Sequence, residues 1–156
     1  MTSFAMNSTN ISKPASYYVK KFGGLAAVDE STSIGDYQAI IVGPKLMQIF
    51  AKITLPLIGF YRWKGKRLQG NGKGVNIYLD KNNNDFPKNP MNIATSASWL
   101  DQKPALILSY PAGSPFFCRF LRDELRRLDD DTIILVGWID LPILRRSPNA
   151  MLLRKI

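Results

Sequence analysis

The sequence of 156 residues contains no histidine and only one cysteine. The absence of histidine excludes Ser-His-Asp and Cys-His catalysis, an imidazole general base and zinc sites that combine histidine with few cysteines. Cys118 has no partner for an internal disulfide, so we expect a small buried side chain in a reducing compartment. We therefore predict no metal site and no cofactor.

A secretory signal and a long uninterrupted apolar run are also missing. Residues 1–10 contain neither a basic segment nor an apolar stretch, so we expect the protein in the cytoplasm. Residues 40–60 are apolar overall, but two lysines and two prolines interrupt them, which disfavours a membrane span. Without repeats or linkers, residues 16–156 are predicted to form one domain, after a flexible arm rich in Ser, Thr and Asn over residues 1–15.

What the sequence does contain is enough apolar material for a core and an excess of basic residues. Hydrophobic residues make up 46% of the chain, and the net charge is +9. Residues 1–79 hold ten Lys and Arg against three acidic residues, whereas residues 80–156 hold eleven against nine. The N-terminal half therefore carries most of the positive charge, which suits anionic ligands or surfaces.

Short apolar runs separated by turn residues predict an antiparallel β protein. Asn71 and Gly72 supply the positive φ angles of a tight hairpin, and residues 81–90 are predicted to form an exposed loop containing Pro87 and Pro90. Closure into a barrel of about eight strands would pair every edge. The predicted strands are Asp36–Val42, Phe60–Leu68, Val75–Leu79, Met91–Trp99, Ala105–Tyr110, Phe117–Leu128, Thr132–Asp140 and Ala150–Lys155.

One of these strands, residues 117–128, also has a helical pattern. A helix would gather Phe117, Leu121, Leu125 and Leu128 on one stripe. The acidic turn at residues 129–131 instead favours an antiparallel pair with the β-prone run that follows it. We prefer the strand because it completes the barrel.

One amphipathic helix is predicted to begin at Pro44 and to end near Thr54. It would cap one end of the barrel or lie on its surface. Residues 16–27 are predicted to form either a short helix or a packed extended segment, because Gly23 and Gly24 interrupt the pattern. The helix after Pro44 has one apolar stripe, made of Leu46, Ile49, Phe50, Ile53 and Leu57, and an opposite side with Lys45, Gln48 and Lys52.

Three short motifs occur along residues 34–140. They are Gly35-Asp-Tyr37, Trp63-Lys-Gly-Lys66 and Arg122-Asp-Glu-Leu125. Together they resemble an uncharacterised bacterial family of lipocalin-like, calycin-type proteins. The resemblance implies an antiparallel barrel with an interior cavity, and it implies no particular ligand.

The charged residues 122–126 constrain what faces the barrel interior. In a strand, Asp123 shares a face with Leu121 and Leu125, while Arg122, Glu124 and Arg126 share the other face. A carboxylate that points inward needs a partner. The expected partners are Lys66, Arg62 or Lys64, or the hydrogen-bond donors Asn76 and Tyr110; an exposed face and a catalytic carboxylate are the alternatives.

The leading functional hypothesis is a barrel that binds a small hydrophobic or amphipathic molecule in its cavity. An anionic end of that molecule would be held by Lys66 or Arg62. The predicted ligand-binding residues are Tyr37, Arg62, Trp63, Lys66, Asn76, Tyr110, Arg122 and Asp123.

Two alternatives belong to other classes. The first is attachment to an anionic membrane surface through residues 44–57, with Lys45, Lys52, Lys64 and Arg67 as the basic surface. The second is a barrel isomerase, cyclase or lyase that uses Asp123, Glu124 or Tyr110, although the lack of a catalytic motif favours a protein that is not an enzyme. Nucleic acid is disfavoured, because strand alternation sends Tyr61 and Trp63 to one face, from which these aromatic side chains enter the core.

Overall fold

A computed structural model describes residues 11–156 as a closed barrel of eight antiparallel strands. Each strand pairs with its neighbour in the sequence, and β8 pairs with β1 to close the barrel. The prediction of a mainly β, eight-stranded barrel is therefore confirmed. The strands are β1 (Gly35–Ile41), β2 (Trp63–Gly70), β3 (Lys73–Leu79), β4 (Asp85–Ala97), β5 (Pro104–Ser109), β6 (Leu121–Arg127), β7 (Thr132–Ile139) and β8 (Asn149–Lys155).

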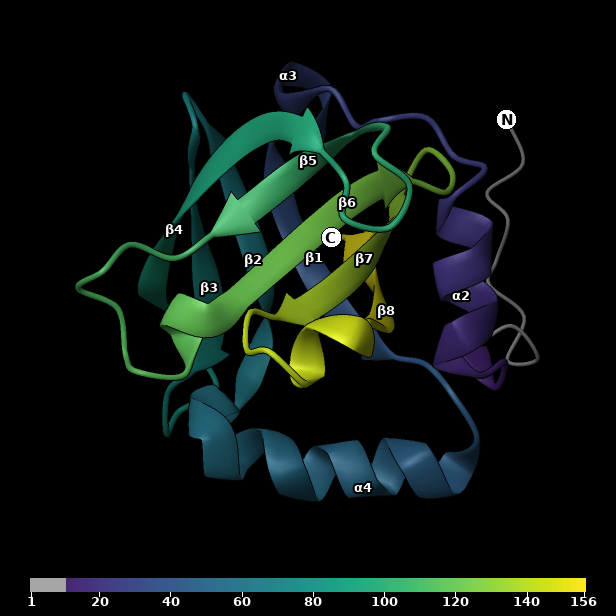
Figure 1. The fold of residues 1–156 in the computed structure, drawn as a ribbon. Helices are drawn as coiled ribbons and strands as arrows, with labels where there is room; N and C mark the ends of the chain where they lie inside the picture. The colour runs from purple at the N-terminus through teal and green to yellow at the C-terminus, as the bar shows by residue number, and fades with distance from the viewer. Residues whose placement is uncertain (1–10) are drawn as a thin grey trace.

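Helices cover the side and one end of this barrel (Figure 1). Helix α2 lies along the wall beside β7 and β8, and α4 crosses the end of the barrel between β1 and β2. No helix within residues 11–156 is long and apolar enough to cross a membrane. The helical elements are α2 (Ala15–Phe22), α3 (Glu30–Ser33), α4 (Lys45–Leu55), the π-helical turn η1 (Pro56–Phe60), and the 3-10 turns η2 (Cys118–Phe120) and η3 (Leu144–Arg146).

The barrel wall is buried on both faces along β7. Ile133 and Leu135 point into the interior cluster, whereas Ile134 and Val136 belong to a second cluster outside the wall. Helix α2 supplies the buried Phe22 to this outer cluster. A strand covered on both sides is apolar at every position, which explains the unbroken apolar run of β7.

Strand β4 is longer than predicted, because it includes the segment with Pro87 and Pro90 that was expected to be a loop. This part of β4 pairs with β3 but not with β5, whose pairing begins at Asn92. A proline is tolerated at such an edge because the missing N–H removes no ladder hydrogen bond. The tight turn at Asn71 and Gly72 was predicted correctly, with φ angles of 55° and 71°.

The segment that was predicted as either strand or helix contains both structures. Residues 121–127 form β6, as preferred, and they are preceded by the single helical turn η2. The predicted strand over residues 60–68 also begins later, at Trp63, because Phe60 ends η1. Of the predicted arm, residues 1–10 lie outside the described part of the chain, and Ala15 is instead the first residue of α2.

Candidate functional site

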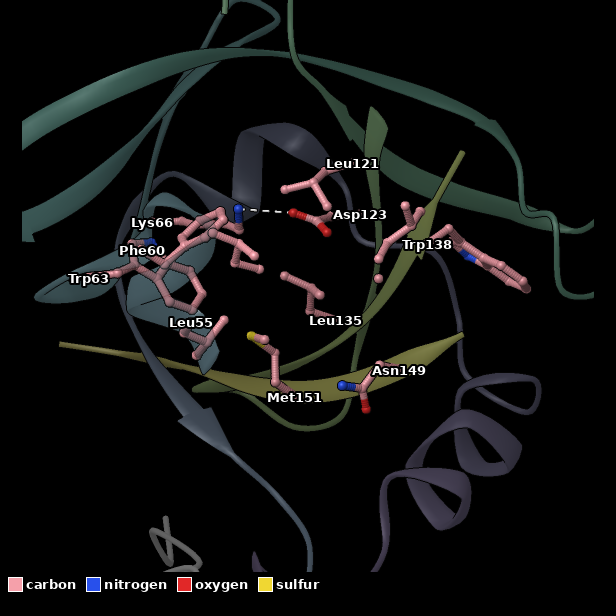
Figure 2. Close-up of a pocket in the computed structure, with 13 residues that line it drawn as sticks. Leu55, Phe60, Trp63, Lys66, Leu121, Asp123, Leu135, Trp138, Asn149 and Met151 are labelled. Atoms are coloured by element: carbon pink, nitrogen blue, oxygen red, sulfur yellow. Dashed lines mark ion pairs between the residues drawn. The ribbon is translucent and has the colours of Figure 1, made fainter. Parts of the chain in front are cut away.

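A cavity of about 150 Å³ lies inside the barrel at the end where α4 crosses it (Figure 2). Strands β2, β6, β7 and β8 supply its wall, together with the end of α4 and η1. The lining is apolar apart from one ion pair and one asparagine. The lining residues are Leu55, Ile58, Phe60, Trp63, Lys66, Leu121, Asp123, Leu135, Gly137, Trp138, Ile139, Asn149 and Met151.

The rest of the barrel interior is filled with side chains. Leu68, Met91, Leu106 and Leu153 belong to the interior cluster and are almost completely buried. They lie on the halves of their strands that are remote from α4. The hollow that the barrel hypothesis requires is therefore confined to one end.

A β-bulge brings Trp63 and Lys66 to the same face of β2. Strict alternation would send residues three apart to opposite faces of a strand. The register of β2 against β3 shifts between Trp63 and Gly65, so that Lys64 is an extra residue in the ladder. Both Trp63 and Lys66 consequently line the cavity.

The residues just before β2 also depart from alternation. Phe60 and Trp63 both face the cavity, and their rings meet edge to face with centroids 5.3 Å apart. Arg62 adopts a φ angle of 56°, which breaks the strand pattern, and Tyr61 is 68% exposed. The prediction that Tyr61 enters the core together with Trp63 was wrong.

Asp123 points into the barrel and forms an ion pair with Lys66, the first of its expected partners. The carboxylate oxygen Oδ2 lies 2.9 Å from Lys66 Nζ, and Figure 2 shows the pair at the edge of the cavity. Lys66 Nζ also donates to Asn76 Oδ1 at 3.1 Å and to the Tyr110 hydroxyl at 2.9 Å. Its three donors are therefore all used.

The surroundings of Lys66 keep this side chain charged. The ammonium group is only 2% exposed, and burial alone would lower its pKa. The negative charge of Asp123 and the hydrogen bonds to Tyr110 and Asp123 outweigh burial and raise the pKa above the usual 10.5. Asn76 and Tyr110 stand behind the pair, where the Asn76 amide donates to the Tyr110 hydroxyl at 2.8 Å.

The second oxygen of Asp123 is the polar atom that this pair leaves for a ligand. Oδ1 accepts no hydrogen bond from any residue within the described range 11–156. A methyl group at Gly137 would stand 3.4 Å from it, so the absence of a side chain there keeps this oxygen accessible. The cavity thus combines mainly apolar walls with one carboxylate oxygen that accepts no hydrogen bond from the described residues.

Five of the eight predicted ligand-binding residues do not line the cavity: Asn76 and Tyr110 are connected to it only through Lys66, and three others lie away from it. The Tyr37 hydroxyl donates to the Ser33 carbonyl at 2.8 Å, at the α3 end of the interior. Arg62 donates to the Leu79 carbonyl at 3.2 Å beside the loop after β3. Arg122 lies on the outer face of β6, where its guanidinium stacks on the Trp99 ring at 4.5 Å. Tyr37 faces the barrel interior but at the end remote from the cavity, whereas the positive φ of Arg62 and strand alternation at Arg122 direct those two side chains out of the interior.

Glu124, one of the catalytic candidates, is also outside the cavity. Its carboxylate is fully buried between the barrel wall and the loop after β4. It accepts hydrogen bonds from the Ser98 hydroxyl, from the Trp99 amide at 2.9 Å and from Arg122 Nε at 2.9 Å. These contacts make Glu124 a residue that anchors the loop, whereas Asp123 lines the cavity and Tyr110 contacts it only through Lys66.

The four predicted surface cations divide into two kinds. Lys45 and Lys52 are exposed on α4. Lys64 pairs with Asp85 at 2.7 Å, and Arg67 makes a two-pronged pair with Asp36 at 2.6 and 2.7 Å. Of these four cations, Lys45 and Lys52 are therefore the two that form no ion pair with a carboxylate of residues 11–156.

A second hollow of about 380 Å³ lies between α4 and the barrel. It shares four lining residues with the cavity: Leu55, Ile58, Asn149 and Met151. The two hollows therefore adjoin each other beneath α4. Residues 11–156 bring no three acidic, Cys or His side chains together as a metal site would require.

Sequence reasoning did not single out the apolar lining from η1, β7 and β8. Leu135, Asn149 and Met151 have no motif that distinguishes them from core residues of any barrel. For η1 the sequence did offer a signal: the apolar stripe of the preceding helix continues past Pro56, which indicates that this segment also packs near the end of the barrel.

Comparison with known proteins shows the fold and no more. No family model matches the chain, and no curated protein matches it. A crystal structure of a protein from Thermomonospora curvata is similar, with a TM-score of 0.67 and 14% sequence identity, over 93% of this chain and 89% of that chain. The resemblance to lipocalin-like proteins stays a prediction.

Proposed function

We propose that the barrel binds a small, mainly apolar molecule that donates a hydrogen bond to Asp123 Oδ1. The observation that carries this proposal is a hollow of about 150 Å³ with apolar walls and one unused carboxylate oxygen. Apolar cavities with a few polar groups are the usual form of small-molecule sites. A cavity of this size holds a molecule of about the size of benzene.

The charge of the site favours a neutral ligand over the anionic one expected from the sequence. Lys66 and Asp123 neutralise each other, and Asn76 and Tyr110 take the remaining Lys66 donors. An anion would have to displace Asp123 from Lys66 and then stand beside that carboxylate. A hydroxyl or amine donor needs no such exchange.

The adjoining hollow beneath α4 supports an amphipathic ligand with a tail. A ligand whose head lies in the cavity can extend its tail past Leu55 and Ile58, which line both spaces. Gly59 has a φ angle of 95°, and Ile58 departs from helical geometry. This break within η1 is the place where the cavity rim can move to admit a ligand.

The test compares phenol with toluene, which are similar in size and differ by one donor. Calorimetric titration of the wild-type protein should detect binding of both. In the Lys66→Met/Asp123→Leu variant the ratio of phenol affinity to toluene affinity should fall about tenfold or more, because the charged acceptor is gone. Gly137→Ala, which adds a methyl group beside Oδ1, should lower the ratio in the same direction.

The control is Gly113→Ala, since no atom lies within 4 Å of the added methyl group. It should leave both affinities unchanged. If wild-type protein binds neither probe, the cavity is not a ligand site. If both bind and the ratio is unchanged in both variants, Asp123 does not receive the ligand.

A further inference from the structure

The topology of the barrel gathers four connections at one end. In an antiparallel barrel with neighbouring strands paired in sequence order, the segments after β1, β3, β5 and β7 emerge on the same side. These segments are residues 42–62, 80–84, 110–120 and 140–148, and we call this side the α4 end. Figure 1 shows α4 and η3 together there, and α3 at the opposite end.

The α4 end exposes a group of large apolar side chains from three separate connections. Helix α4 has no buried residue. Its Met47 and Phe50 border the hollow next to the barrel, but its apolar side chains remain largely exposed: Leu46 is 76% exposed, and Leu57, which follows in η1, is 78% exposed. Ile143, from the connection after β7, is 85% exposed. The full group is Leu46, Met47, Ile49, Phe50, Ile53, Leu57, Ile58, Tyr61, Phe116, Phe117, Leu141, Ile143 and Leu144. A patch of this kind marks an interaction surface.

The charges of the two ends have opposite sign. The α4 end has seven basic residues against Asp80 and Asp140; the basic residues are Lys45, Lys52, Arg62, Lys81, Arg119, Arg145 and Arg146. The opposite end comprises residues 29–34, 71–72, 98–103 and 128–131. These connections have one basic residue, Lys103, and the ends of β6 and β8 add Arg127 and Lys155, against Asp29, Glu30, Asp101, Asp129, Asp130 and Asp131. The molecule is therefore an electrical dipole along the barrel axis.

We propose that the α4 end docks onto an anionic lipid bilayer, with the apolar group inserted at the level of the headgroups. Basic residues that surround exposed apolar side chains provide both contributions to interfacial binding, attraction to anionic lipid and burial of apolar area. The acidic opposite end orients the molecule so that the α4 end approaches first.

A second copy of the chain fits this surface poorly. Two α4 ends facing each other would place fourteen basic side chains against four acidic ones, as the counts for one end imply. Like charges across an interface oppose association. A negatively charged bilayer removes this repulsion, and it accommodates apolar side chains that project from separate connections without needing a complementary shape.

This inference goes beyond ligand binding in the cavity and does not require it. The two are nevertheless compatible, because Leu55 and Ile58 line the cavity at the α4 end. A docked molecule would hold the opening beneath α4 against the lipid. The residues chosen for the test below do not line the cavity.

The test is sedimentation with two kinds of vesicle, phosphatidylcholine alone and phosphatidylcholine mixed with phosphatidylserine. Wild-type protein should bind the mixed vesicles at least about tenfold more tightly than the neutral ones, and high salt should weaken that binding. Ile53→Glu/Leu57→Glu should reduce binding to the mixed vesicles about tenfold or more. Lys45→Glu/Lys52→Glu should act in the same direction.

The matched control places the same charge at the other end of the barrel. Ile156 is 60% exposed and follows β8 at the α3 end, so Ile156→Glu should leave vesicle binding unchanged. Failure of the wild-type protein to bind mixed vesicles overturns the proposal. So does equal binding by the Ile53→Glu/Leu57→Glu variant, or a stable dimer that dissociates in that variant. Phenol binding by the same variants is measured separately. Phenol binding that persists when vesicle binding fails shows that the membrane proposal is wrong while the cavity proposal still holds.

Discussion

At the residue scale, the ion pair of Lys66 and Asp123 controls both stability and the polarity of the cavity. Removing one partner leaves a buried charge without compensation, so Asp123→Ala should lower the free energy of unfolding by about 3–5 kcal/mol. Replacing both charges by apolar side chains, as in Lys66→Met/Asp123→Leu, should recover most of that loss. Urea denaturation of the three proteins measures the difference. Equal stability of the single and double variants would contradict the assignment of a charged, buried pair.

A second residue-scale prediction concerns alkaline pH. Burial raises the pKa of Tyr78 to about 12, and its hydroxyl donates to the Gly59 carbonyl at 3.3 Å. The folded state holds the Tyr78 proton more tightly than the unfolded state does. The protonated hydroxyl therefore contributes fully to the free energy of unfolding below pH 10, and this contribution is lost as the pH rises toward 12. The pKa of Lys66 is also raised above its usual value of 10.5, so Lys66 likewise makes the folded state less stable as the pH rises above that value.

The free energy of unfolding should therefore fall above pH 10, with Tyr78 contributing about 2–3 kcal/mol of the decrease. Chemical denaturation at a series of pH values between 9 and 12 measures the slope. Tyr78→Phe should flatten this slope. An unchanged slope in that variant would show that other groups cause the alkaline loss.

At the element scale, the close approach of β1 and β2 depends on a residue without a side chain. A methyl group at Gly65 would stand 1.9 Å from the Tyr37 carbonyl oxygen, so Gly65→Ala must separate the two strands. We expect a loss of about 1–3 kcal/mol or more from this overpacking. Gly113→Ala, which meets no atom within 4 Å, should change stability by less than about 0.5 kcal/mol. Denaturant midpoints of the two variants should differ clearly, and similar midpoints would refute the argument.

The elements themselves were largely predictable because their signals are local. Turn residues at Asn71 and Gly72 and the proline before α4 act within a few residues of themselves, so the hairpin and the helix were placed correctly. The bulge at Lys64 has no comparable signal, since it depends on how β2 meets β3. The positive φ of Arg62 has no comparable signal either, and missing it placed Phe60 and Tyr61 on the wrong faces, whereas Trp63 was correctly predicted to face the interior.

At the scale of the whole molecule, Arg126 ties α2 and the loop after β4 to the barrel. Its fully buried guanidinium donates to the Phe22 carbonyl at 3.0 Å, to both oxygens of Asp101 at 2.7 and 2.8 Å, and to the carbonyls of Lys103 and Pro104. All five N–H donors are thereby used. Three structural units that are distant in sequence meet at this one side chain.

Lysine cannot replace this arrangement, because an ammonium group lacks the planar set of five donors. Arg126→Lys should lower the free energy of unfolding by about 3 kcal/mol, as for a broken buried pair. It should also loosen α2, so that trypsin cleaves sooner after Lys20 or Lys21 in this helix. The half-buried neighbour Arg127, changed to lysine, serves as the control. Unchanged cleavage in Arg126→Lys would show that α2 is held by apolar packing alone.

The sequence by itself determined that the protein is a mainly β barrel, that α4 is amphipathic and that Asp123 needs a buried partner. Each of these follows from composition, from a period of two or 3.6 residues, or from the energy of burying a charge, and none requires knowledge of distant contacts. Tertiary structure decided that the partner is Lys66, that Glu124 lies outside the wall, and that the hollow is confined to the α4 end. Those outcomes depend on strand register and on barrel closure, which join residues far apart in the chain and leave no periodic trace in the sequence.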